Sequence, residues 1–158
     1  MAVACLTPFG VALPMNSARA QMVANCSQKM DFGKFAIAGG TGKLTITPAG
    51  SVPTHPNIVT VIPPTVGICK ISGFTGTTGT LQIQVSQTKA TITNAGNVLT
   101  VKSFDVAKKN EGRTKTYISA SLTKTTVTYN IGATLRADGG DPVGVYTGSV
   151  IIIHTYTN

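Results

Sequence analysis

The chain has no tryptophan, and among its 158 residues there are only two histidines and five acidic side chains. Catalytic and metal sites need several such groups close together, so this sequence offers little material for either. Charged residues make up only 11 % of the chain, whereas 42 % of its residues are hydrophobic. Disordered proteins usually show the opposite balance. The composition therefore predicts a folded domain with a core and argues against an enzyme.

The side chains that could carry chemistry are scattered. His55 lies in a proline-flanked loop and His154 near the end of the last hydrophobic run, and no Asp, Glu or Cys stands at a spacing that would complete a metal site with either. Asp138 and Asp141 bracket two glycines, a pattern more typical of a tight turn than of a calcium loop. There is no nucleophile elbow, P-loop or dinucleotide fingerprint. We expect no catalysis and no cofactor or metal.

The N-terminus resembles an export signal. Residues 2–15 are mostly apolar, and Ser17-Ala-Arg-Ala20 offers a small-residue cleavage site. We therefore expect a signal peptide over residues 1–20 and a single domain over residues 21–158. No Lys or Arg precedes the apolar stretch. Two explanations stay open: the start codon is placed too late in this sequence, or the segment is not cleaved.

The cysteines agree with export. Cys5 would leave with the signal, and Cys26 and Cys69 would remain as a pair. In an exported domain such a pair is typical of a disulfide. The alternative, a metal pair, would require two further ligands that are not nearby in the sequence. We predict a disulfide and a location in the periplasm, at the cell surface or outside the cell.

The net charge of +8 is spread along the chain. Its densest stretch, Lys108–Lys115, is expected to be a solvated loop, with an acidic polysaccharide, lipid or nucleic acid as the functional alternative. Nucleic-acid binders more often cluster basic and aromatic residues on one element. We expect neither nucleic-acid binding nor a membrane-spanning segment in the mature chain.

Short runs with alternating apolar residues recur between turn residues, which predicts an all-β protein. No window keeps a helical spacing, apart from a single possible turn at Phe104–Asn110. We expect an immunoglobulin-like antiparallel Greek-key sandwich, either complete or one strand short. The predicted strands lie at residues 30–37, 44–47, 57–62, 68–71, 81–85, 90–93, 98–101, 118–122, 127–135 and 144–158.

The final run, residues 144–158, is the most hydrophobic of these and is expected to form one long strand inside a sheet. Because strand side chains alternate, one face would carry seven residues: Gly144, Tyr146, Gly148, Val150, Ile152, His154 and Tyr156.

This run resembles the closing strand of archaic chaperone–usher pilins of the spore-coat-protein-U type. Met30-Asp-Phe-Gly33, shortly after Cys26, is similar to the opening of the same proteins. Tyr129-Asn-Ile-Gly-Ala-Thr-Leu135 resembles a segment of a family of bacterial secreted β domains related to these pilins. Together the motifs extend over nearly all of the expected mature chain.

The resemblance implies a sandwich that lacks one strand and leaves an apolar groove open. A periplasmic chaperone would fill this groove first. An usher is the second implied partner, and in the fibre the N-terminal extension of a neighbouring subunit would replace the chaperone. The resemblance places five residues at this interface, namely Gly144, Tyr146, Val150, Ile152 and Tyr156.

Two features depart from the pilin pattern. Cleavage after Ala20 would leave only Gln21–Asn25 ahead of Cys26, whereas a donor strand needs about ten residues. His154 stands where the pilins usually carry an apolar residue. The expected function is a structural or adhesive surface subunit. The alternative is a self-complete module that binds an envelope or glycan partner through loops such as Gly73–Gly79 or Lys108–Lys115.

Overall fold

The computed structural model describes residues 22–157, with gaps at 54, 74–78, 109–116, 122–124 and 142–144. These residues form an all-β structure, as predicted. Eleven strands follow one another along the described chain: β1 (Val23–Gln28), β2 (Lys34–Ile37), β3 (Thr41–Ile46), β4 (Ile58–Ile62), β5 (Gly67–Ser72), β6 (Thr80–Val85), β7 (Lys89–Asn94), β8 (Asn97–Lys108), β9 (Tyr117–Ser121), β10 (Thr126–Asp138) and β11 (Ile152–Thr157).

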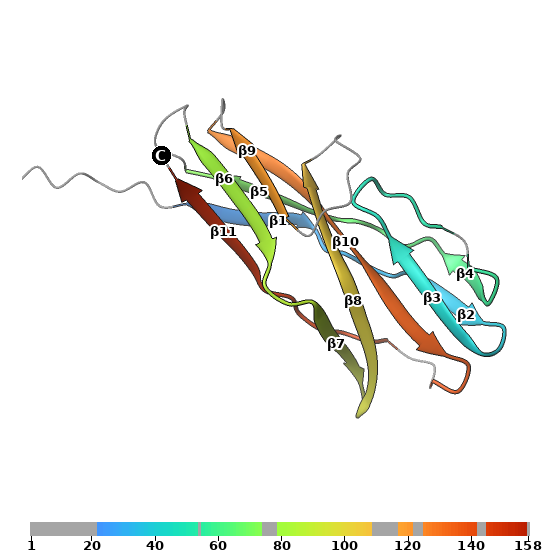
Figure 1. Cartoon of the computed structure of the whole chain (residues 1–158). Coiled ribbons are helices and arrows are strands. Elements are labelled where there is room, and N and C mark those ends of the chain that lie inside the picture. Colours follow the sequence, from blue (N-terminus) through green and yellow to red (C-terminus); the bar gives the residue numbers. More distant parts are fainter. Residues whose placement is uncertain are drawn as a thin grey trace, which may run out of the picture.

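The strands form two antiparallel sheets and a separate ribbon. The larger sheet has the order β1-β5-β10-β8-β7, and β3 pairs with the second half of β10 beside β5. The smaller sheet has the order β11-β6-β9, and β2 and β4 form the ribbon. The long strands β8 and β10 run along the molecule, and the β2–β4 ribbon lies at the end opposite the end of β11 (Figure 1).

The core lies between the two sheets, and β10 shows how the sequence builds it. Its alternate residues from Val127 to Ala137 are buried, whereas Thr128 and Thr134 on the other face are only partly covered. Leu81, Ile83 and Val85 of β6 supply the facing layer and are buried as well. Burying such side chains contributes about 1.5–3 kcal/mol each, so this alternation determines which face of each sheet turns inward.

The strand order matches that of an immunoglobulin-type sandwich. In that fold strands A, B, E and D form one sheet and strands C, F and G form the other. Here β1, β5, β10 and β8 take the places of A, B, E and D, and β6 and β11 take those of C and F. Among the described residues no strand takes the place of G beside β11. Within the described ranges, the smaller sheet therefore ends at β11 on that side.

The helical turn expected at Phe104–Asn110 is wrong, because β8 continues as a strand to Lys108. Ser103 has a positive φ of 53°, and the register of β8 against β10 shifts there. This bulge inserts one residue between the buried Val101 and Phe104. The apolar spacing thus departs from a strict period of two, although the segment remains a strand.

The final run is not one long strand as expected. Thr147 forms an isolated bridge with Thr93 of β7, and regular pairing with β6 begins only at Ile152. The C-terminal segment thus passes from the larger sheet to the smaller one. Gly148 lies against the backbone of Thr91, where a Cβ would come within 2.6 Å of the carbonyl oxygen. A glycine permits this close approach between the two segments.

A tight hairpin joins the two strands that were predicted at residues 90–93 and 98–101, and its turn can be tested by mutation. Ala95 and Gly96 connect β7 to β8 with φ values of 46° and 89°. Turns of this kind favour Asn-Gly, because a left-handed conformation costs most other residues about 1 kcal/mol or more. We expect Ala95→Asn to raise the free energy of unfolding by about 0.5–1 kcal/mol, measured by urea denaturation. Ala49→Asn, in an exposed turn without a positive φ, should change it little.

Candidate functional site

The predicted disulfide between Cys26 and Cys69 is confirmed, and it joins directly opposed residues of β1 and β5. Directly opposed residues of antiparallel strands point to the same face. Cys69 and Ile71 of β5 point into the core and are each only 1 % exposed. Their partners on β1, Cys26 and Ala24, are nevertheless exposed. The smaller sheet therefore does not extend over β1, and the inward face of β1 is left open.

On this side the smaller sheet ends, within the described residues, at β11. Its outward residues, such as Ile153 at 47 %, are exposed, whereas three residues of the opposite face are half-buried: Ile152, His154 and Tyr156. His154 reaches β10, where its Nε2 lies 2.6 Å from the hydroxyl of Tyr129. In the smaller sheet β6 packs over β8, and its neighbour β11 contacts β10 through His154. The smaller sheet therefore lies across the larger one. We use the term open side for the region bounded by the inward residues of β1 and β11.

The outer edge of β11 carries no strand within the described chain. The amide of Ser86 donates to the carbonyl of Ile151, which sets the alternation of the ladder between β6 and β11. In that alternation the amides of Ile152 and His154 point away from β6 and toward the unpaired edge. An unpaired edge beside half-covered apolar side chains is a typical site for strand addition.

The structure brings together only some of the predicted interface residues. Ile152 and Tyr156 lie on the open side, and the Tyr156 ring packs where a Cβ of Gly79 would be. Tyr146 and Val150 are partly buried against the core in the segment that approaches β7. Gly144 lies outside the described residues. The period of the sequence placed these residues on one face, but it missed the change of sheet that separates them.

The inward residues of β1 escaped sequence analysis. All six residues of this strand are exposed, so no alternation of apolar and polar residues marks it. Its one signal was the cysteine, which locates β1 only once its partner is known.

Comparison with known proteins adds one finding. A family model described as a domain of unknown function, DUF4402, matches residues 23–156. The chain belongs to the DUF4402 family. The match begins at the first residue of β1 and ends within β11, so this DUF4402 domain includes both borders of the open side. No curated protein and no solved structure matches the chain.

Three further polar residues of the DUF4402 domain, His55, Asp138 and Asp141, form local hydrogen bonds. His55 Nδ1 accepts the amide of Asn57, and Asp138 and Asp141 close the turn after β10. The described residues contain no cluster of three or more His, Cys, Asp or Glu side chains placed to hold a metal. Nor does any helix within the described ranges have the length and apolar character needed to cross a membrane.

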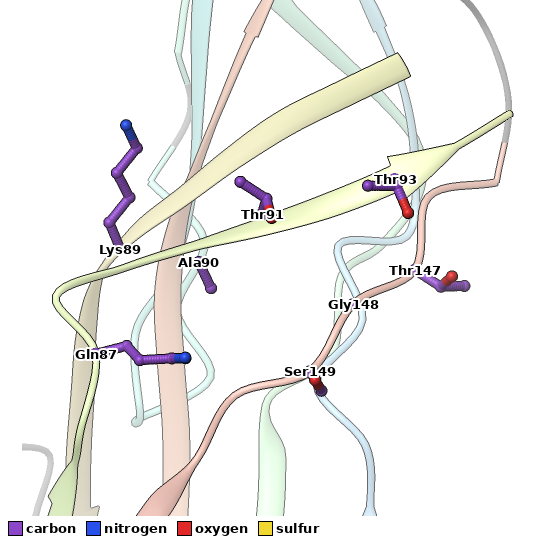
Figure 2. Close-up of a pocket in the computed structure, with 8 residues that line it drawn as sticks. All are labelled: Gln87, Lys89, Ala90, Thr91, Thr93, Thr147, Gly148 and Ser149. Carbon is purple, nitrogen blue, oxygen red and sulfur yellow. The ribbon is translucent and has the colours of Figure 1, made fainter. Parts of the chain in front are cut away.

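A surface depression of about 530 Å³ lies away from the open side, between β7 and the C-terminal segment. Its lining is mostly hydroxyl and amide groups: Gln87, Lys89, Ala90, Thr91, Thr93, Thr147, Gly148 and Ser149. Gln87 extends toward Ser149 across it, whereas Lys89 points away (Figure 2). Gln87 Oε1 is buried and has no hydrogen-bond partner within the described structure. The candidate loops at 74–78 and 109–115 lie outside the described residues.

The contact between Tyr129 and His154 predicts how stability depends on pH. Burial raises the pKa of Tyr129 to about 12, and burial lowers the pKa of His154. At His154 the unfolded chain therefore binds more protons than the folded one below about pH 6.5, and at Tyr129 it binds fewer above about pH 10. We expect the unfolding free energy to fall as the pH drops below about 6.5, and to fall by up to about 2 kcal/mol between pH 10 and 12.

Urea denaturation across these pH ranges measures both effects. Tyr129→Phe should abolish the alkaline loss, because the variant has no hydroxyl to ionise at this position. An unchanged alkaline loss in this variant would contradict the assignment to Tyr129.

Proposed function

We propose that this DUF4402 chain is a structural, adhesive cell-surface protein, a pilin-like subunit that is completed by a strand from another molecule. The observation that carries the proposal is the open side. The place of strand G is empty among the described residues, the edge of β11 is unpaired there, and the inward face of β1 is exposed. An added strand would pair with β11 and cover Ala24 and Cys26. Burial of apolar surface and new backbone hydrogen bonds would both favour this addition.

The disulfide supports the cellular location that this function requires. Disulfides persist in oxidising compartments and are rare in the cytoplasm. The Cys26–Cys69 bond therefore fits a protein outside the cytoplasm. The proposed partners are a periplasmic chaperone, an usher and neighbouring subunits, which would occupy the open side in turn.

The position of β1 limits what such a subunit can give to its neighbour. Val23, Ala24 and Asn25 belong to β1 and pair with β5. If cleavage follows Ala20, only Gln21 and Met22 precede β1. A chain processed in this way would accept a strand without donating one.

The test is an unheated SDS gel of protein sheared from the native cell surface and detected with an antibody against this chain. A ladder that collapses to one band on boiling supports polymerisation by strand addition, and then more than Gln21 and Met22 must precede β1. A single band without heating counts against a polymer and favours a capped or self-complete domain.

The depression beside β7 favours a second candidate function, a module that binds an envelope or glycan partner. Its hydroxyl-rich lining and the unpartnered Gln87 Oε1 suit a ligand that is rich in hydrogen-bonding groups. Binding to a glycan array that is lost in Gln87→Ala and retained in Ile152→Asp would favour this function over the subunit role.

A further inference from the structure

The strand β4 is a second unpaired edge with an unusual sequence. It reads Ile58-Val59-Thr60-Val61-Ile62, which is the same in both directions. Its last four residues are exposed, with Val59 at 56 % and Val61 at 60 %. One edge of β4 pairs with β2, and within the described residues the other edge has no partner strand. Exposed, uncharged and hydrophobic strand edges are association sites.

The ladder to β2 shows which backbone groups reach the free edge. The amide of Ala38 donates to the carbonyl of Asn57, so these two residues form a hydrogen-bonded pair. Antiparallel ladders alternate, and the amides of Ile58 and Thr60 therefore point away from β2. Thr60 is the central residue of the strand. A partner strand can thus bond to its midpoint.

We propose that β4 is a self-association edge, on which a second copy of this chain adds its own β4 in antiparallel orientation about a two-fold axis at Thr60. A two-fold interface requires that residue i of one copy meet residue j of the other and the reverse. The sequence of β4 is a palindrome, so each cross-strand pair of the dimer would consist of two identical residues. Ile58 meets Ile62 of the second copy, Val59 meets Val61, and Thr60 meets Thr60. Thr–Thr pairs and pairs of β-branched residues favour sheet pairing.

Charge selects the same edge. At a two-fold axis any charged residue would face its own charge, and the chain as a whole carries +8. No residue of β4 is charged. The nearest charge on β2 is Lys34, which lies opposite Ile62 at the end of the ladder and away from the axis.

The register against β2 shifts at Val61, which shortens the regular pairing. One five-residue strand also buries less than the ~1,200 Å² of a standard interface, so we expect a weak dimer that depends on concentration.

The β4 edge lies at the opposite end of the molecule from the end of β11 (Figure 1). Self-association there would leave the open side accessible. In a fibre it would add a second contact between chains, and the high local concentration of subunits would strengthen a weak contact.

The experiment is sedimentation of the folded protein over a range of concentrations, with two variants of opposite charge at the axis. Thr60→Lys and Thr60→Asp should each weaken the dimer at least tenfold, because like charges then face each other. An equimolar mixture of the two should restore a heterodimer, because the charges become complementary. Val98→Lys places the same charge on an exposed valine of β8 and should leave the dimer unchanged.

A wild-type protein that stays monomeric at millimolar concentration would overturn the proposal, as would a dimer that survives Thr60→Lys or a mixture that stays monomeric. Thermal denaturation of each variant shows whether it is folded. The result is independent of the proposed subunit role, because Ile152→Asp should leave the β4 dimer intact. A β4 dimer also dissociates in SDS without heating, whereas strand-exchanged polymers require boiling.

Discussion

Replacing Ile152 with aspartate should abolish the heat-dissociable ladder of surface protein, whereas replacing Ile153 with aspartate should leave it close to wild type. The two residues are neighbours of the same type on β11 but point to opposite faces. Ile152 turns toward the open side and packs partly on the core, and Ile153 is 47 % exposed on the outer face. A carboxylate at Ile152 would lose hydration when a partner strand covers it, and this penalty opposes strand addition. Ile153→Asp controls for the added charge.

Two measurements separate loss of assembly from loss of folding. Thermal denaturation should show that Ile152→Asp is still folded, although less stable than the wild type. Tyr156→Ala removes a second side chain of the open side without adding charge and should also reduce assembly and chaperone capture. Normal ladders in folded Ile152→Asp and Tyr156→Ala would count against the open side as the site of strand addition.

The strands that could be predicted from sequence are those with one face in the core. In β6 and β10 the apolar residues alternate, because each sheet buries one face and exposes the other. The hairpin at residues 94–97 was equally predictable, since its turn requires particular residues. These features depend on neighbours in the sequence or on a simple division between core and solvent.

The features that could not be predicted depend on what lies beside each strand. β8 contains a bulge at Ser103 that breaks the period of two, so its continuation past Phe104 was missed. β1 is exposed on both faces and has no pattern at all. The division of the C-terminal segment between two sheets involves a close approach of Gly148 to Thr91, a contact between residues far apart in the chain.

The candidate site shows the same limit. Alternation along the final run placed Ile152 and Tyr156 on one face, and both are half-buried in the structure. It could not show that the edge beyond them has no partner strand in the described part of the chain, because this depends on where every other strand pairs. The exposure of Ala24 and Cys26 became informative only through their buried partners on β5.

Loss of the disulfide should have the largest effect on stability. Cys26 and Cys69 are separated by 43 positions, and in the chain-entropy model closing a loop of this length stabilises by about 4 kcal/mol. We expect the double variant Cys26→Ala/Cys69→Ala to lose unfolding free energy of this order, measured by urea denaturation without reductant. Wild-type protein should lose a similar amount when a reductant is added, and the double variant should not respond to it. Equal stabilities with and without the bond would contradict the prediction.

The loss should begin at β1. Every residue of this strand is exposed, and its described attachments are the ladder to β5, two side-chain hydrogen bonds from Ser27 and Gln28, and the disulfide to the buried Cys69. Without the covalent bond, little apolar burial opposes its detachment. Hydrogen exchange should therefore rise at Val23–Gln28 before it rises in β10, whose inward face is buried. Because β1 borders the open side, the same variant should also capture a partner strand poorly. Unchanged exchange at β1 in the double variant would show that the ladder to β5 holds the strand alone.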